Sequence, residues 1–218
     1  MSQLLTSVSP CLAWLKVTGA IFFGLAWNVS SHDTIVSIDA KVAAWLHTHA
    51  VVPLTHVMMV VTHANSTVAM TAWAVLFAVI LWRMRERYWV ASLALALGGG
   101  MLLNVAIKEA YERARPHFDD PFLTLHSYSF PSGHTAGATL FYGVLAAFMI
   151  SRSRSHGRRA AWVAFAILAI ALVAFSRIYL GAHYLSDVLA AACSSTAWLV
   201  LSLATVRTII HRRMERRA

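Results

Sequence analysis

Residues 176–187 read SRIYLGAHYLSD and place an arginine, a histidine and an aspartate at the end of an apolar run that has no other charge. Charged side chains are costly in such surroundings and usually serve a function. If the chain is helical from His183 onward, the spacing of four places His183 and Asp187 one turn apart on the same face. The carboxylate can then accept a hydrogen bond from one imidazole nitrogen and leave the other nitrogen free as a nucleophile.

Arg177 adds a planar cation that suits a tetrahedral oxyanion such as phosphate. A purely structural interpretation is also open at this point. In that interpretation Arg177 lies at a membrane interface, and His183 is an ordinary interfacial histidine with a local partner. The choice between them depends on the rest of the chain.

The composition is that of an integral membrane protein. Of the 218 residues, 59% are hydrophobic and 12% are charged, whereas soluble domains contain about 25% charged residues. Eight Trp and six Tyr suit the aromatic belts at two membrane interfaces. The net charge of +9 is typical of basic loops that face an anionic leaflet, so membrane lipids are expected partners and nucleic acid is not.

Six apolar segments are predicted to span the membrane, and the first of them is long enough by itself, since a span needs about 20 residues. We expect spans at about residues 12–29, 65–82, 89–107, 136–150, 160–175 and 184–206. Gly98, Gly99 and Gly100 in the third span indicate close helix packing or, alternatively, a hinge. The helix of this span is expected to run on until Pro116 ends it.

Two shorter segments lie between the first and second spans. Residues 34–49 carry apolar side chains at helical spacing, with Asp39 outside the apolar positions, which predicts a helix lying in the interface. Pro53 interrupts a second short apolar piece, which is expected to be interfacial or re-entrant. The predicted fold is therefore an all-α polytopic membrane protein, with six transmembrane helices and these interfacial helices, in a single domain over residues 1–218.

Basic residues gather in alternate loops. Three Lys or Arg follow Trp82, four follow Ile150 and five lie from Arg207 onward, so that these segments hold 12 of the 18. The positive-inside rule makes this side cytoplasmic and predicts that both termini are there. The polar motifs are then expected on the outer face of the cell membrane.

The polar loop of residues 117–130 ends in Pro131-Ser132-Gly133-His134, and an apolar helix follows it. Ser132 can cap this helix, so that free N–H groups and the positive end of the helix dipole face the loop. An anion suits such a site. Two further cations, Lys108 and Arg115, lie just before the loop and are expected on the same membrane face.

Three cations, a helix N-terminus and two histidines can bind a doubly charged tetrahedral oxyanion. The members of this set are Lys108, Arg115, Arg177, Ser132, Gly133, His134 and His183. Phosphoryl transfer fits it, because the transition state spreads charge over three equatorial oxygens and needs one group on each side of the in-line path. His183, oriented by Asp187, would attack, and His134 would protonate the leaving oxygen.

At these positions the chain closely resembles the type 2 phosphatidic acid phosphatase (PAP2) superfamily. The signature of that family is a lysine, six residues and Arg-Pro; then Pro-Ser-Gly-His; then Ser-Arg, five residues, His, three residues and Asp. The matching positions are Lys108 with Arg115-Pro116, Pro131 to His134, and Ser176-Arg177 with His183 and Asp187. Ala114 and Leu185 stand where proline is common in the family, which affects loop shape more than any reacting group.

The resemblance covers about residues 65–205 and implies six membrane helices. It implies a phosphohistidine intermediate on His183 and proton donation by His134. It also implies phosphate contacts from Lys108, Arg115, Ser132, Gly133 and Arg177. The substrate would be a lipid phosphate or diphosphate, hydrolysed without a cofactor or an obligate protein partner. No metal is expected either, because the outer carboxylates have no recognisable ligand spacing for a hard cation; they are Glu109, Glu112, Asp119, Asp120 and Asp187.

The motifs bind the phosphate and leave the lipid open. Small bacterial members of the family act mostly on undecaprenyl diphosphate, phosphatidic acid or phosphatidylglycerol phosphate. Arg113, His117 and His126 in the outer loop could contact a second phosphate, which slightly favours undecaprenyl diphosphate, or could simply form a solvated basic loop.

Other functions are also open. A lipid phosphotransferase would share every motif, because the motifs do not encode the acceptor. A transporter is a remote alternative, since its charges should lie along an ion path and not at one face. The soluble haloperoxidases that share the anion site are not expected to have six apolar spans.

Overall fold

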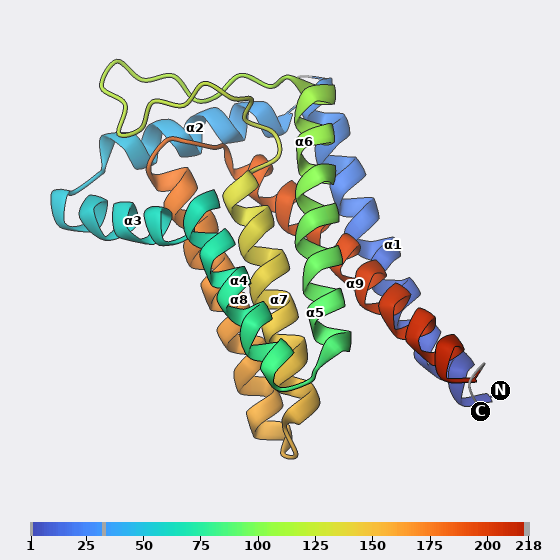
Figure 1. Cartoon of the computed structure of the whole chain (residues 1–218). Helices are drawn as coiled ribbons and strands as arrows, with labels where there is room; N and C mark the ends of the chain where they lie inside the picture. The colour runs from blue at the N-terminus through green and yellow to red at the C-terminus, as the bar shows by residue number, and fades with distance from the viewer. Residues whose placement is uncertain (1, 32–33, 216–218) are drawn as a thin grey trace.

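A computed structural model of the protein describes residues 2–31 and 34–215, and within these ranges the chain forms helices and loops (Figure 1). The elements are α1 (Ser2–Ser30), α2 (Thr34–Thr48), α3 (Val52–Ala64), α4 (Thr67–Arg83), α5 (Arg87–Ala94), the π-helical turn η1 (Leu95–Gly99), α6 (Gly100–Tyr111), α7 (Gly133–Arg152), α8 (His156–Tyr179) and α9 (Leu185–Glu215). The prediction of an all-α fold is confirmed.

Within residues 2–31 and 34–215, five helical segments are long and apolar enough to cross a membrane. They are Leu12–Ser30 of α1, Arg87–Tyr111 across α5, η1 and α6, Gly133–Arg152, His156–Tyr179 and Leu185–Ile209. The apolar helix α4 has 17 residues, the lower end of the usual range of about 17–25. We take α4 as the remaining span, so the six expected spans have counterparts in the structure.

Helices α2 and α3 are separated by a bend of 119°. Both lie across the direction of α7 and α8 (Figure 1), as expected of interfacial helices. Pro53 occupies the first turn of α3, where the missing N–H costs nothing. Asp39, which the sequence places outside the apolar positions of α2, is nevertheless buried, with only 1% exposed.

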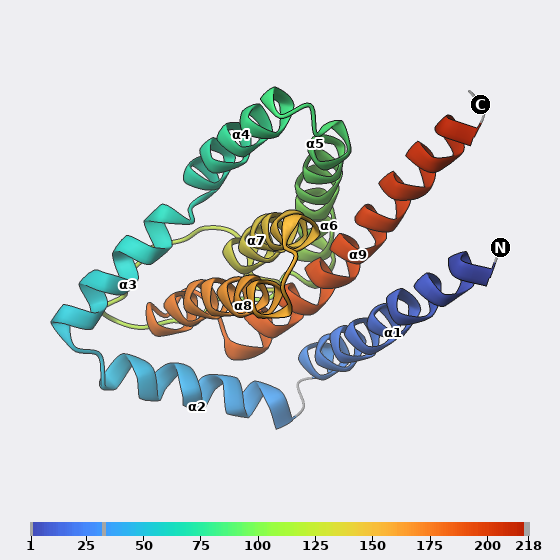
Figure 2. The ribbon, with the colours of Figure 1, turned by 90° about the horizontal axis from the view of Figure 1, so that it is seen from below.

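Helix α7 is the central span. Within its apolar window 56% of the residues are buried, and it packs against α4, α5, α6, α8 and α9 (Figure 2). Phe77 of α4 and Trp89 of α5 both place their rings edge-to-face on Phe148 of α7. These aromatic contacts fix the C-terminal part of α7 and thereby the position of its N-terminus.

The three glycines of the third span serve different purposes. A Cβ on Gly99 would lie 2.3 Å from the Trp198 ring, and one on Gly100 would lie 2.5 Å from Leu140. Trp198 also donates from Nε1 to the Leu95 carbonyl at 3.2 Å. Close helix packing is therefore confirmed for Gly99 and Gly100, whereas the corresponding position at Gly98 faces open space.

Two helix boundaries differ from the sequence prediction. Helix α6 ends at Tyr111, well before Pro116, because Glu112 adopts the left-handed conformation with φ of 44°. Helix α9 begins at Leu185, so His183 precedes the helix instead of forming part of it. The predicted cap is confirmed: Ser132 Oγ accepts a hydrogen bond from the Thr135 N–H at 3.4 Å.

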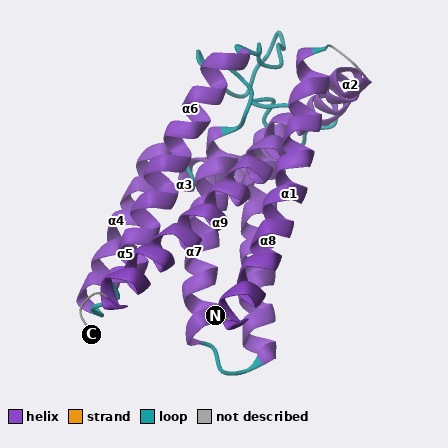
Figure 3. Ribbon diagram, turned by 90° about the vertical axis from the view of Figure 1, so that its right-hand side faces the viewer, coloured by secondary structure: helices purple, strands orange, loops and turns teal. Residues whose placement is uncertain are grey.

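The motif residues and the basic loops lie toward opposite ends of the bundle. The long loop after α6 and the turn between α8 and α9 are at one end, beside α2 (Figure 1). The α7–α8 loop, the α4–α5 loop and the described ends of α1 and α9 lie toward the other end, and a view from the side shows the long loops gathered at the first end (Figure 3). The three signature segments are therefore brought together.

Candidate active site

His183 lies in the turn that connects α8 to α9, and it is 1% exposed. The turn requires glycine at residue 181, where φ is +65° and a Cβ would lie 2.8 Å from the Phe118 ring. The N–H of His183 donates to the carbonyl of Arg177 at 3.2 Å, which ties the turn to the last turn of α8. The backbone of His183 is thus fixed between two spans.

The two nitrogens of the His183 imidazole have different neighbours. Nδ1 lies 3.5 Å from Oδ2 of Asp187, and Nε2 lies 3.2 Å from Nη1 of Arg115. Burial lowers the pKa of His183 to about 4, although Asp187 acts in the opposite direction. A neutral imidazole at neutral pH, with Nε2 next to a cation that can bind phosphate, has the protonation state of a nucleophile.

Asp187 is fully buried and is held by several donors at once. Its Oδ2 accepts from Ser129 Oγ at 2.5 Å and from the N–H of Tyr184 at 2.9 Å. Its Oδ1 accepts from Nη1 of Arg113 at 2.6 Å. The carboxylate that faces His183 therefore has a fixed position and orientation.

The three predicted phosphate-binding cations are held by neutral groups. Lys108 Nζ donates to the Tyr128 carbonyl at 2.6 Å, and Arg115 donates to the carbonyls of Ser127 and Ala182 at 2.6 and 2.5 Å. Nη1 of Arg177 donates to Thr62 Oγ1, and its buried Nε has no partner in the part of the chain that the structure describes. Among the described residues none of the three forms a salt bridge, so their charge is available to an anion.

The start of α7 completes the anion site. Ser132 is fully buried, and its N–H donates to the carbonyl of Asp187 at 3.1 Å, which joins the N-termini of α7 and α9. Gly133 and His134 form the first turn of α7, where backbone N–H groups are free of intrahelical partners. Asn104 lies beside Gly133, and its buried Nδ2 also lacks a partner. Free donors therefore surround this site on several sides.

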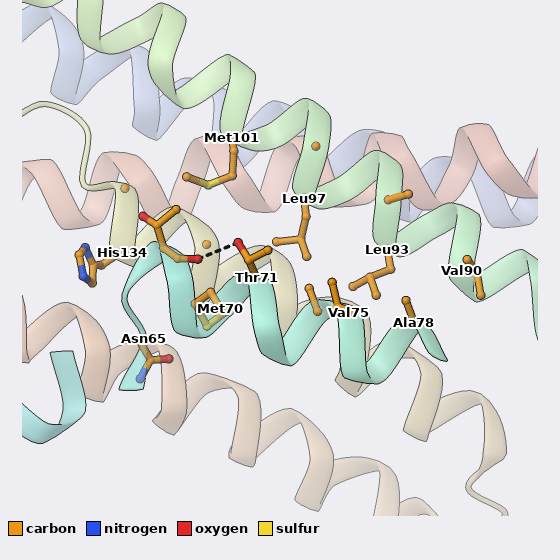
Figure 4. Close-up of a pocket in the computed structure, with 16 residues that line it drawn as sticks. Asn65, Met70, Thr71, Val75, Ala78, Val90, Leu93, Leu97, Met101 and His134 are labelled. Carbon is orange, nitrogen blue, oxygen red and sulfur yellow. Dashed lines mark hydrogen bonds between the residues drawn. The ribbon is translucent and has the colours of Figure 1, made fainter. Parts of the chain in front are cut away.

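An apolar groove of about 460 Å³ reaches the site. It lies between α4 on one side and α5, η1 and α6 on the other, and His134 lies at one end of it (Figure 4). Side chains from both walls line its length, among them Met70, Val75, Leu93, Leu97 and Met101. Gly98 lies on the wall of the groove, in the open space noted above.

The sequence pattern of the PAP2 superfamily matches residues 89–210. The chain belongs to this superfamily. A curated relative is phosphatidylglycerophosphatase B of Bacillus subtilis strain 168, which is 33% identical over 138 residues, or 62% of this chain and 67% of the relative.

Two solved structures are similar to this PAP2 protein. One is a crystal structure of a transmembrane PAP2 type phosphatidylglycerolphosphate phosphatase from Bacillus subtilis, with a TM-score of 0.75, 27% identity, and coverage of 89% of this chain and 96% of the other. The other is LpxE of Aquifex aeolicus, with a TM-score of 0.63, 24% identity, and coverage of 77% and 95%. The similarity to LpxE shows that the two proteins share a fold. The similarity to the first structure also supports the assignment of this chain as a phosphatase.

Three residues of this PAP2 site were not predicted from the sequence. Ser129 and Arg113 bind Asp187, and Asp39 binds Arg113 Nη2 through Oδ2 at 2.8 Å. The interpretation of Arg113 as a solvated residue is wrong, because its side chain is 10% exposed. Two carboxylates engage its guanidinium, which argues against a contact with a second phosphate. The sequence contains no clear signal for this site, because Asp39 lies on an amphipathic helix that also carries Lys41 and His47.

The other residues of the outer loop are peripheral to the site. His117 and His126 are exposed, as expected of a solvated loop. Asp120 accepts a hydrogen bond from Nε2 of His47 at 2.9 Å, and the His47 ring stacks on Phe118 with centroids 4.0 Å apart. These contacts fasten the loop to α2.

Proposed function

We propose that this single-domain protein is an integral membrane lipid phosphatase that removes phosphate from a lipid phosphate through a phosphohistidine intermediate on His183. The observation that carries the proposal is that the apolar groove ends at His134, beside three cations that have no anionic partner in the described part of the chain. A lipid can therefore place its tail in the groove and its phosphate among the cations. The membership of the PAP2 superfamily and the similarity to phosphatidylglycerophosphatase B support a phosphatase.

The proposed reaction has two half-reactions. In the first, Nε2 of His183 attacks phosphorus, the bond to the lipid oxygen breaks, and His134 gives that oxygen a proton. In the second, His134 takes a proton from water, the water oxygen attacks phosphorus, and the bond to Nε2 breaks to release phosphate and free His183. Lys108, Arg115, Arg177 and the α7 N-terminus stabilise the equatorial oxygens, so the proposal involves no metal.

The groove favours a glycerophospholipid over a polyprenyl diphosphate. Thr67 and Ala78 line the groove and are eleven residues apart on α4, which is about 16 Å of helix. This length suits one acyl chain and is far shorter than an undecaprenyl chain. Arg113 was suggested from the sequence as a contact for a second phosphate, but its side chain is already bound by two carboxylates. We therefore propose phosphatidylglycerol phosphate or phosphatidic acid as the substrate, in place of undecaprenyl diphosphate.

The substrate proposal predicts that Gly98→Leu lowers kcat/KM for long-chain phosphatidylglycerol phosphate by about 10-fold, because the new side chain occupies the groove and each buried CH₂ contributes about 0.8 kcal/mol. Hydrolysis of a short-chain analogue should change little. The measurement is phosphate release in mixed micelles from phosphatidylglycerol phosphate, phosphatidic acid and undecaprenyl diphosphate, with a lipid acceptor in a parallel assay.

Gly24→Leu is a matched control, because a side chain at Gly24 in α1 also meets open space but lies outside the groove. An equal loss in both variants would contradict a role of the groove. Undecaprenyl diphosphate as the best substrate would overturn the proposed substrate class. Phosphate on the lipid acceptor instead of in water would show that the protein is a phosphotransferase.

We also propose that the site faces the outer side of the cell membrane and that both termini are cytoplasmic, because the three basic segments lie toward the other end of the bundle. In a variant with Cys11 and Cys193 replaced by serine, a cysteine at Asp120 should react with an impermeant maleimide in intact cells. Cysteines at Glu86, Ser155 and Glu215 should react only after the membrane is permeabilised. Protection of position 120 in intact cells would contradict this topology.

A further inference from the structure

Asp39, on the interfacial helix α2, is a buried carboxylate that no motif of the family contains. Its Oδ2 accepts from Nη2 of Arg113 at 2.8 Å and from Ser186 Oγ. Its Oδ1 accepts from the N–H of Ser186 at 2.9 Å, in the first turn of α9. Asp39 thus caps α9 from another helix and pairs with Arg113 at the same time.

Arg113 connects this carboxylate to the one beside His183. Its Nη1 donates to Asp187 Oδ1 at 2.6 Å and to Ser186 Oγ at 2.7 Å, while its guanidinium lies 4.3 Å from the centre of the Tyr184 ring. Burial acts to lower the pKa of Arg113, but the carboxylates of Asp187 and Asp39 outweigh it and raise this pKa, so the side chain stays charged. One cation therefore bridges two buried carboxylates in a fork geometry that only arginine provides.

The net charge of Asp187, Arg113 and Asp39 affects how stable a positive His183 imidazole is. Arg113 with Asp187 alone would be a neutral pair, and the imidazole would face a carboxylate whose charge is balanced. With Asp39 added, the three side chains carry one net negative charge next to Nδ1 of His183. Such a charge stabilises a positive imidazole, which forms when His183 bonds to phosphorus.

We infer that Arg113 and Asp39 are positioning residues for phosphoryl transfer, which hold the Asp187 carboxylate against His183 and keep one net negative charge beside its imidazole. This inference rests on the proposed nucleophilic role of His183. Neither residue touches the phosphate, since both act through Asp187. The interfacial helix α2 is accordingly part of the catalytic structure through Asp39.

The test uses charge changes of opposite sign in the purified full-length protein. Arg113→Gln removes a positive charge, so it should raise the pKa of His183 and move the acidic limb of the kcat profile to higher pH by about one unit. Asp39→Asn removes a negative charge and should move the limb to lower pH. In the double variant the two changes offset each other, and the limb should return close to that of the wild type.

The other charged and titratable groups around His183 are unchanged in these variants. They are Arg115 from the loop, Arg177 from α8, Asp187 from α9 and His134 from α7. We expect kcat to fall about 10- to 100-fold in each single variant, with KM nearly constant and with Arg113→Lys recovering part of the loss. Asp119→Asn is the matched control, because Asp119 is an exposed carboxylate of the outer loop, and it should leave the profile unchanged.

The outcomes separate the inference from the proposed function. Shifts of opposite sign, in proteins whose thermal unfolding in detergent matches the wild type, support the positioning role. An acidic limb that stays in place in both single variants, or that moves in the same direction, overturns it. Wild-type protein that releases phosphate without a phosphohistidine would overturn the proposed mechanism instead, and single-turnover trapping in the wild type distinguishes the two results.

Discussion

His183→Ala is expected to abolish turnover, with a loss of at least about 10⁴-fold in kcat, because the variant lacks the side chain that we propose bonds to phosphorus. The reason is geometric. Nδ1 of the imidazole faces Asp187 and Nε2 faces Arg115, so the nitrogen that we propose as the nucleophile lies next to a cation able to bind phosphate. In rapid-quench experiments with radiolabelled substrate, the wild type should accumulate an acid-labile, base-stable phosphohistidine, and the variant should not.

The control has to exclude loss of the fold, because His183 is buried. His183→Asn retains a polar side chain of intermediate size and should be equally inactive while unfolding near the wild-type temperature. His117→Ala, at an exposed position of the outer loop, should keep wild-type turnover. Phosphohistidine that still forms in His183→Ala would assign the nucleophile to another residue.

Much of this architecture could be predicted from the sequence because it depends on local signals. The lengths of the apolar segments predicted the spans, and Ser132 as a helix cap predicted the start of α7. The spacing between Arg177, His183 and Asp187 predicted that these residues lie together where α8 ends and α9 begins. A signal of this kind is carried by neighbouring residues along the chain. It was therefore readable without knowledge of the tertiary structure.

The parts that were missed depend on contacts between distant segments. Asp39 and Asp187 meet through Arg113 only because α2 folds over the start of α9, and nothing near Asp39 in the sequence indicates a buried partner. Helix α6 ends early because Glu112 takes a left-handed conformation that its sequence does not demand. The groove likewise arises because α4 lies on one side of it and α5, η1 and α6 lie on the other, an arrangement that hydropathy does not reveal.

The second large effect concerns His134, whose replacement should lower kcat/KM far more for some substrates than for others. His134→Ala is expected to lower kcat/KM for a lipid phosphomonoester by about 10²- to 10⁴-fold, since the departing glycerol oxygen is strongly basic and needs a proton. An alkyl-substituted nitrophenyl phosphate has an acidic leaving group, so the loss there should be about 10-fold or less. The measurement is the ratio of kcat/KM values of variant and wild type on the two amphiphiles.

This comparison also separates proton donation from binding. His134 lies at one end of the apolar groove, which we propose holds the lipid part of the substrate (Figure 4). If its role were only to bind phosphate, both substrates would lose the same factor, because they share the phosphoryl group. An equal loss would therefore contradict the proton-donor role. A lipid diphosphate, whose leaving group is an acidic lipid phosphate, should behave like the nitrophenyl ester, because its departure needs little protonation.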